Sequence, residues 1–178
     1  MAEADWQARV EALEARVEIS HLLYGYARAC DRADEALMRS CFWPDSTHRH
    51  GKFEGLSSDF VNYAFTIISR MNFAAHHISN PTIEVRGDKA FSECYFIAHH
   101  RRVAEDGGEA DDFYEGRYLD FHERRNGVWK IVRRYGTSDF VSAAVPANIP
   151  YAQWTAGHSD RAPSDQYYAM RQEFLRAN

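Results

Sequence analysis

An aspartate and a pair of adjacent histidines are the residues whose types most suggest acid–base chemistry in this chain. Asp31 follows an apolar stretch that carries Tyr24 and Tyr26, and His76-His77 lie where helical patterns give way to strand patterns. A carboxylate is disfavoured near the C-terminal end of a helix, where the helix dipole is already negative. If Asp31 holds a histidine, the two make a general base, because the carboxylate fixes the imidazole tautomer and raises its basicity. Helix spacing alone favours the simpler alternative, in which Asp31 only begins the following turn.

Further polar candidates lie on expected strands. Successive side chains of a strand point to opposite faces, so at most one of His76 and His77 can enter a cavity. On two long strands expected later in the chain, the same alternation makes His100 and Tyr118 candidates for one inner face. His50 shares a face of a short extended segment with His48. These side chains could surround a bound molecule.

Nine histidines raise the question of a metal site. His48, His50, His76 and His100 could converge, but beyond His48-x-His50 no ligand spacing typical of a metal site is present. The chain also has no glycine-rich phosphate loop, dinucleotide fingerprint or nucleophile elbow. We therefore expect neither a metal nor an organic cofactor.

Three arginine pairs could suggest phosphate binding. They flank expected hairpins and strand ends, where charges usually keep a sheet edge solvated. Arg134 belongs to the last pair and could point either into the interior or outward. The pairs are Arg101-Arg102, Arg124-Arg125 and Arg133-Arg134.

Composition excludes several classes of protein. The chain has 178 residues, of which 45% are hydrophobic and 26% charged, so one domain with a sizeable core is expected. A formal net charge of −5 argues against nucleic acid or an anionic membrane as the main partner. The three cysteines form no CxxC pair, and the charged N-terminus does not resemble a signal peptide. We therefore expect a cytoplasmic protein that binds neither nucleic acid nor a membrane.

Hydrophobic periodicity predicts three helices followed by a run of strands. Trp6, Val10, Leu13 and Val17 step by four, three and four, which is a helical stripe of about two heptads. The expected helices cover residues 5–30, 33–43 and 58–71. The expected strands cover residues 82–85, 90–102, 113–125 and 128–140, with Asn126-Gly127 as a tight hairpin turn.

This order of elements predicts an α+β fold, in which a strongly curved, mostly antiparallel sheet closes over three N-terminal helices as a cone-shaped barrel around a pocket. Residues 1–140 would form that domain. Residues 141–178 carry three prolines and a short helix over residues 164–176, and would form a tail that caps the pocket or contacts another subunit.

Three short segments resemble the SnoaL-like, scytalone dehydratase-like branch of the nuclear-transport-factor-like superfamily. They are Leu23-Tyr24-Gly-Tyr26-Ala-Arg-Ala-Cys30-Asp31, His76-His-Ile-Ser-Asn80 and Arg125-Asn-Gly-Val-Trp129-Lys-Ile. The resemblance spans residues 17–140 and implies a conical pocket in a homodimer or homotrimer. In dehydratase-like members, an Asp at the end of the first helix supports a pocket His, and these roles would fall on Asp31 and His76.

The resemblance also implies a second pocket histidine on the long strand, which would be His100. The full set that we expect to bind a substrate is Tyr24, Tyr26, His50, His100, Tyr118 and Arg134. Cys30 and His50 stand where the dehydratase has water-holding tyrosines, and Gly116 and Tyr118 replace a small hydroxyl residue and an amide. We therefore do not expect scytalone itself as the substrate.

The function implied is a cofactor-independent lyase, of dehydratase or retro-aldol type, acting on a small hydroxylated aromatic or polycyclic compound. Two alternatives stay open. One is a non-catalytic ligand-binding or accessory subunit, like the β subunit of a ring-hydroxylating dioxygenase. The other is an isomerase or cyclase that uses the same pocket. Fold alone does not decide among them.

Overall fold

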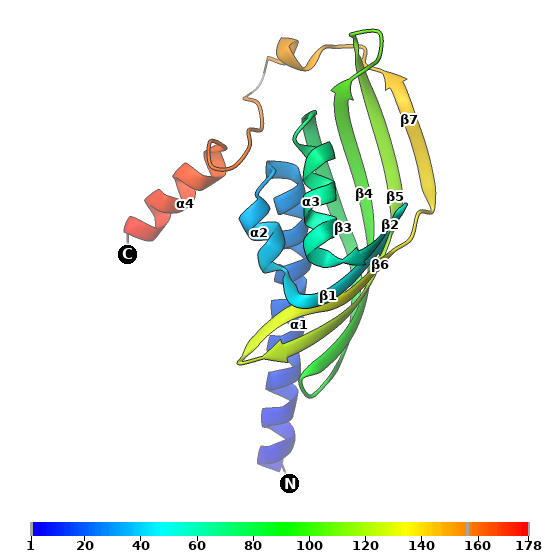
Figure 1. The fold of residues 1–178 in the computed structure, drawn as a ribbon. Helices are drawn as coiled ribbons and strands as arrows, with labels where there is room; N and C mark the ends of the chain where they lie inside the picture. Colours follow the sequence, from blue (N-terminus) through cyan, green and yellow to red (C-terminus); the bar gives the residue numbers. More distant parts are fainter. Residues whose placement is uncertain (1, 156, 178) are drawn as a thin grey trace.

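A long helix lies against a curved sheet, and the two together position every candidate residue (Figure 1). The computed structural model describes residues 2–155 and 157–177. The helices are α1 (Ala2–Arg32), α2 (Glu35–Ser40), α3 (Ser57–Ile68), η1 (Tyr151–Gln153) and α4 (Gln166–Arg176). The strands are β1 (Phe42–His50), β2 (Phe53–Leu56), β3 (Met71–Arg86), β4 (Lys89–Val103), β5 (Glu109–Arg125), β6 (Val128–Gly136) and β7 (Phe140–Pro146).

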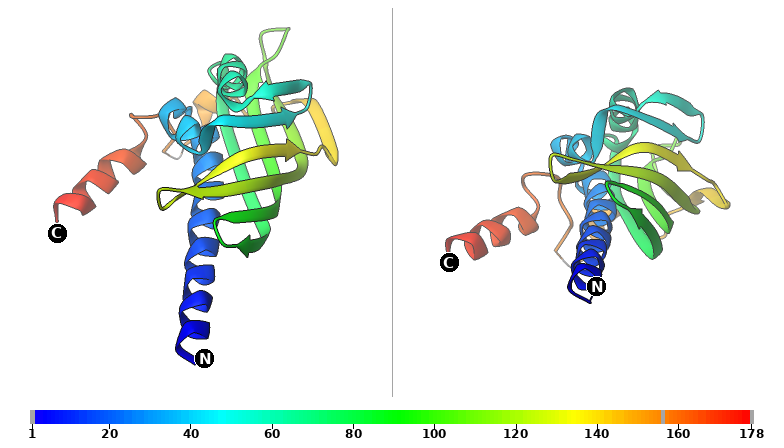
Figure 2. Two further views of the ribbon diagram at one scale, coloured as in Figure 1. Left: turned by 60° about the horizontal axis from the view of Figure 1, so that its bottom comes forward. Right: turned by 90° about the horizontal axis from the view of Figure 1, so that it is seen from below.

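The sheet is mostly antiparallel, as predicted. Its order is β2-β1-β6-β5-β4-β3, and β7 pairs with β5 outside this path. Only the β1–β6 pair runs parallel within the described residues. The sheet curves around the helices without closing, so the α+β cone is confirmed as an open one (Figure 2).

Helix α1 forms because its apolar positions recur at helical spacing. Ala15, Ile19, Leu23, Tyr26 and Cys30 are all at most 4% exposed and line the face that meets the sheet. The steps between them are four, four, three and four residues, which is one stripe of a helix. The C-terminal end of this stripe carries Asp31 into the interior.

The central strands follow strict alternation. On β4, Cys94, Phe96 and Ala98 are buried, whereas Tyr95 and Ile97 are each 45% exposed. This alternation places one row of side chains against the helices and the other on the outer face.

The hairpin turn between β5 and β6 agrees with the prediction. Asn126 and Gly127 both have positive φ, at 52° and 78°. A two-residue turn with left-handed conformations matches the right-handed twist of the two strands.

Several boundaries differ from the sequence prediction. The third helix ends at Ile68 instead of residue 71, and the strand expected over residues 82–85 runs from Met71 to Arg86. The second helix ends at Ser40 instead of residue 43, and Pro44 belongs to β1. The β1–β6 register shifts between Phe42 and Thr47, so the proline lies in an irregular stretch where its missing N–H breaks no regular ladder. The last expected strand, residues 128–140, is in fact two strands, β6 and β7, and β7 extends the sheet beyond residue 140.

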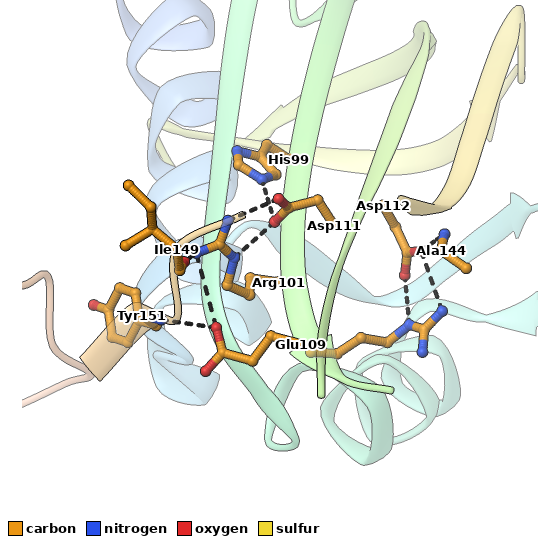
Figure 3. Close-up of polar contacts among 9 residues, drawn as sticks. His99, Arg101, Glu109, Asp111, Asp112, Ala144, Ile149 and Tyr151 are labelled. Carbon is orange, nitrogen blue, oxygen red and sulfur yellow. Dashed lines mark hydrogen bonds and ion pairs between the residues drawn. The ribbon is translucent and has the colours of Figure 1, made fainter. Parts of the chain in front are cut away.

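After β7 the chain crosses the outer face and reaches the C-terminal end of α1. We call residues 147–155 and 157–165 the strap. Arg101 donates a hydrogen bond from Nη1 to the carbonyl of Ile149 at 2.8 Å, and the N–H of Tyr151 donates to Glu109 at 2.8 Å (Figure 3). Asp111 holds Arg101 through two hydrogen bonds, at 2.8 and 2.7 Å. These contacts fix the first part of the strap on β4 and β5.

Candidate active site

The last turn of α1 and the middle of β3 bring together the two predicted catalytic residues. Nδ1 of His76 lies 2.7 Å from Oδ1 of Asp31, and their side chains are 9% and 15% exposed. A carboxylate can only accept, so Nδ1 carries a proton and donates a hydrogen bond to Asp31. In the neutral imidazole, the lone pair is then on Nε2.

The backbone explains why His76, and not its neighbour, meets Asp31. His76 is paired with Ala98 on β4, a residue of the buried row, whereas His77 is paired with Ile97 of the outer row. His77 is exposed accordingly. The contact also gives the Asp31 carboxylate a hydrogen-bond donor at a helix end that would otherwise disfavour it.

His100 lies beside this pair. Its ring centroid is 5.1 Å from that of His76 and 5.4 Å from that of Tyr114. Burial lowers the pKa of His100 to about 3, with a further contribution from His76. Its Nε2 is buried and has no hydrogen-bond partner in the described structure. His100 is thus a neutral imidazole with one polar atom available.

His50 approaches the site from β1. Its ring is 5.7 Å from Tyr118, 6.0 Å from Phe60 and 6.0 Å from Phe96, between centroids. Burial lowers the pKa of His50 to about 4, and Arg134 and His76 contribute. Its Nδ1 is also buried without a partner among the described residues.

Tyr118 and Tyr26 lie deeper in the core. Tyr118 is 2% exposed and stacks on Phe96 at 4.5 Å between centroids. Tyr26 is also 2% exposed and meets Tyr118 edge-to-face at 5.6 Å. Burial raises the pKa of both phenols, so both are neutral hydroxyl groups at ordinary pH.

Arg134 points inward and is paired with Asp120 through Nε and Nη2, while its Nη1 is buried without a hydrogen-bond partner among the described residues. Its guanidinium donates to Asp120 at 2.7 and 2.6 Å, and both side chains are completely buried. It lies between the rings of Tyr26 and Tyr118, at 4.1 and 4.2 Å from their centroids. The structure places this predicted substrate-binding residue in a core ion pair beneath the site.

The structure separates Tyr24 from the other predicted substrate-binding residues. It is 46% exposed, whereas Tyr26 is buried. Two residues apart on a helix are about 200° apart around its axis, so the two tyrosines cannot both face the sheet. Tyr24 lies on the outer surface of α1.

A cavity of about 120 Å³ lies next to Asp31, at the end of α1. The strap forms one wall of this cavity, which is one of the two roles that the sequence analysis left open for the tail. Arg161 reaches across it and donates to the carbonyl of Met71. The wall formed by the strap comprises Tyr151, Ser159, Asp160 and Arg161, and the rest of the lining is Cys30, Asp31, Ala33, Ile68, Met71, Asn72, Phe73 and Ala74.

A larger hollow, of about 690 Å³, is open on the outer face of the sheet. Its lining includes the predicted binding residue Arg134 and His48 beside outer-face residues such as Phe121, but neither Asp31 nor His76. We place the candidate active site at the Asp31–His76 pair, because two buried, uncommitted imidazole nitrogens accompany it there.

No group of three histidine, cysteine or carboxylate side chains among the described residues has an arrangement that could hold a metal ion. In the same part of the chain, no helix is both long and apolar enough to cross a membrane.

Comparison with known proteins gives the family. The SnoaL-like domain model matches residues 11–135, so the chain belongs to the SnoaL-like family of the nuclear-transport-factor-like superfamily. No curated protein matches the sequence.

Solved structures share the fold at low sequence identity. A hexachlorocyclohexane dehydrochlorinase, LinA type 2, superposes with a TM-score of 0.71 and 20% identity, over 83% of this chain and 99% of that one. A "Putative Scytalone Dehydratase" from Novosphingobium aromaticivorans DSM 12444 gives 0.67 and 21%, over 80% and 98%. A protein of unknown function from Mycobacterium tuberculosis, solved as a single-residue variant, gives 0.61 and 18%, over 94% and 89%.

Proposed function

We propose that this protein is a cofactor-independent lyase that acts on a small hydroxylated aromatic or polycyclic compound. The contact that carries the proposal is the 2.7 Å hydrogen bond between Asp31 and His76. Two of the structural neighbours are named as a dehydratase and a dehydrochlorinase, both of which are elimination enzymes. Their likeness supports the reaction class and leaves the substrate to this site's own chemistry.

His76 is the general base in this proposal. Because Nδ1 donates to Asp31, Nε2 can accept a proton from the substrate, and the carboxylate then stabilises the imidazolium. In a dehydration, the C–H electron pair becomes a carbon–carbon double bond and the C–O bond breaks. The departing hydroxide takes a proton back from His76 and leaves as water.

The same base can start a carbon–carbon cleavage. His76 then takes the proton of a hydroxyl group, a carbonyl forms, and the neighbouring C–C bond breaks toward the aromatic ring. The electron pair is accepted by the ring as a phenolate or carbanion, which His76 reprotonates. Both reactions need one positioned base, so the pair supports either.

The surrounding side chains suit a hydroxylated aromatic substrate. His50 and His100 each have a buried nitrogen without a partner among the described residues. Such groups cost free energy unless a ligand or water pairs with them. Phe60, Phe96 and Tyr114 supply flat apolar contacts next to these nitrogens. We expect the ligand to bring hydroxyl groups to the imidazoles and a ring to the aromatic side chains.

An accessory subunit without catalysis is the second candidate. That function has no need of an ordered Asp–His pair, and it predicts an Asp31 that is solvated or paired with arginine and a His76 that faces away. The observed hydrogen bond favours the enzyme. We further propose that the protein is a cytoplasmic homo-oligomer, as expected from the resemblance.

The test is a screen of aromatic alcohols and phenols for elimination or cleavage products, detected by absorbance and mass spectrometry. His76→Ala should reduce turnover of any substrate found by about a hundred- to ten-thousandfold, the usual value of a positioned base. His77→Ala is the matched control, because His77 is the next residue on β3 and is exposed. Equal activity of His76→Ala and His77→Ala would end the assignment.

A further inference from the structure

The N-terminal half of α1 carries an apolar stripe that nothing in the described chain covers. Trp6, Leu13, Val17 and Tyr24 are 65%, 58%, 54% and 46% exposed. With Val10 they advance by four, three, four and seven residues, which is the a/d register of a heptad repeat. We call these five residues the α1 seam. Scattered exposed apolar residues are ordinary, but a row of this length in heptad register marks an interaction site.

The sheet of the same chain cannot cover the seam. It already occupies the other side of α1, where Ala15 and Ile19 pack with Ala90 and Trp129. At about 100° per residue, the centre of that packed stripe lies about 150° around the helix from the seam. The helix also extends past the edge of the sheet toward its N-terminus, so the turns before Ala15 stand clear of the body (Figures 1 and 2).

The charges beside the seam are arranged by sign. In the same register, Arg9 and Arg16 occupy g positions on one flank, and Glu14 occupies an e position on the other. In a parallel pair, each g residue faces the e residue five positions later in the partner, so Arg9 meets the second copy's Glu14. An antiparallel pair would instead place g against g, arginine against arginine. Within the described residues, Arg9 and Glu14 form no ion pair in their own chain.

We propose that α1 pairs in parallel with α1 of a second copy of this chain through the seam. This inference is independent of the proposed chemistry, since no seam residue belongs to the Asp31–His76 site. The next d position after Val17 is Ser20, which offers little apolar surface, so the contact is concentrated over residues 6–17. The helix is already ordered by its packing on the sheet from Ala15 onward, so pairing does not bear the cost of helix nucleation.

A charge-exchange experiment tests the pairing. The molar mass of the full chain is measured by sedimentation over a concentration series, for the unmodified protein and for Arg9→Glu and Glu14→Arg. Each variant places like charges opposite each other, so the two copies should separate at this contact and the measured molar mass should fall. An equimolar mixture of the two variants restores both Arg–Glu contacts and should recover it. Glu11→Arg is the matched control, because Glu11 is exposed on α1 but lies at a b position away from the seam.

Two results would overturn the proposal. One is an unchanged molar mass for Arg9→Glu and Glu14→Arg, and the other is a loss of mass in Glu11→Arg as large as theirs. Circular dichroism of each variant, unchanged from the parent, shows that the fold is kept.

Orientation has its own readout. Parallel pairing brings the two copies of residue 6 together, so Trp6→Cys should form an intermolecular disulfide under mild oxidation. In an antiparallel pair, residue 6 of one copy would face residue 17 of the other. The two copies of residue 6 would then lie about 17 Å apart at 1.5 Å per residue, too far for a disulfide. The native cysteines are buried, so they do not compete. Glu11→Cys, on the far side of the helix, should stay monomeric on a non-reducing gel, and the reverse pattern would refute parallel pairing.

Discussion

Oδ1 of Asp31 accepts a hydrogen bond from Nδ1 of His76 at 2.7 Å, which ties the end of α1 to the middle of β3. The carboxylate thereby fixes which imidazole nitrogen has a free lone pair. Asp31→Asn should lower turnover, because the amide of asparagine can donate to Nδ1 and force the proton onto Nε2. The loss should be smaller than in His76→Ala, because the imidazole itself remains. Steady-state kinetics of the two variants check this, with thermal melting to show that both fold. A fully active Asp31→Asn would mean that Asp31 does not orient the base.

Arg134 gives the second prediction, since it separates a binding role from a structural one. Removing one partner of a buried ion pair leaves the other charge uncompensated, which costs about 3–5 kcal/mol. Arg134→Met should therefore lower the free energy of unfolding by about that amount, measured by urea denaturation. Arg133→Ala, one residue away and exposed, should change it by about 0.5 kcal/mol or less. A stable Arg134→Met with a raised KM would instead support substrate binding.

Two glycines give opposite predictions for the same substitution. A Cβ at Gly116 would lie 2.2 Å from the carbonyl oxygen of Thr137 and 2.9 Å from the Phe96 ring. Gly116→Ala should therefore destabilise the sheet severely or prevent folding. Gly25 is inside α1 with nothing within 4 Å of its Cβ position, so Gly25→Ala should stabilise by about 0.5–1 kcal/mol. Melting temperatures compare the two, and equal effects would contradict the packing at Gly116.

Acid should destabilise the fold through buried histidines. Burial lowers the pKa of His50 and His122 to about 4 and of His100 to about 3, and it also holds the pKa of His48 well below its usual range. Below the ordinary pKa of about 6.5, the unfolded chain binds protons that the folded chain refuses. Stability is therefore full above about pH 6.5 and declines as the pH falls toward about 4, by about 1.4 kcal/mol per pH unit for each histidine.

Urea denaturation at several pH values within this window measures the slope. His122 provides the control variant, because it hydrogen-bonds Ser92 at 2.8 Å and takes no part in the candidate site. His122→Gln should remove about one quarter of the slope, since it removes one of four protons. A slope that does not change in this variant would show that His122 is not held neutral.

How much of this could be read from the sequence depends on the element. Helix α1 and the β4–β5–β6 meander follow from clear periodicity and from the Asn126-Gly127 turn. Of strand β1, only a short extended segment with His48 and His50 on one face could be expected, because Pro44 lies near its start and its inward residues Ser46 and His48 are polar. Their burial is a tertiary effect, caused by α3 covering that face, where Phe60 stacks on His48 at 3.5 Å between ring centroids.

The candidate site could be predicted from the sequence to a similar extent. Strand alternation correctly set His76 apart from His77 and put His100 and Tyr118 on the inner row. The Asp31–His76 contact joins residues 45 positions apart, so only the resemblance suggested it. For the tail, the sequence left open whether it caps the pocket or contacts another subunit, because its role depends on where the tail crosses the sheet, and no periodicity encodes that path.

The strap gives the last prediction. The cavity beside Asp31, of about 120 Å³, is smaller than the roughly 300 Å³ at which ligand pockets begin and is not lined by His76, His50 or His100, so a ligand of aromatic size enters it only if the strap moves. Arg101, itself held by Asp111, binds the first part of the strap through the Ile149 carbonyl. Arg101→Met should therefore speed hydrogen exchange at residues 149–153 more than in β4 and β5.

Arg117→Met is the control for that variant. Arg117 also forms two ion pairs on the sheet, with Glu93 and Asp139, but none with the described residues of the strap. It should leave exchange at residues 149–153 unchanged, so a difference between the variants isolates the contact at Ile149. If exchange in Arg101→Met rose equally along β4 and β5, the variant would have loosened the whole sheet. The strap would then not be a separately released segment, and the substrate would have to enter by another route.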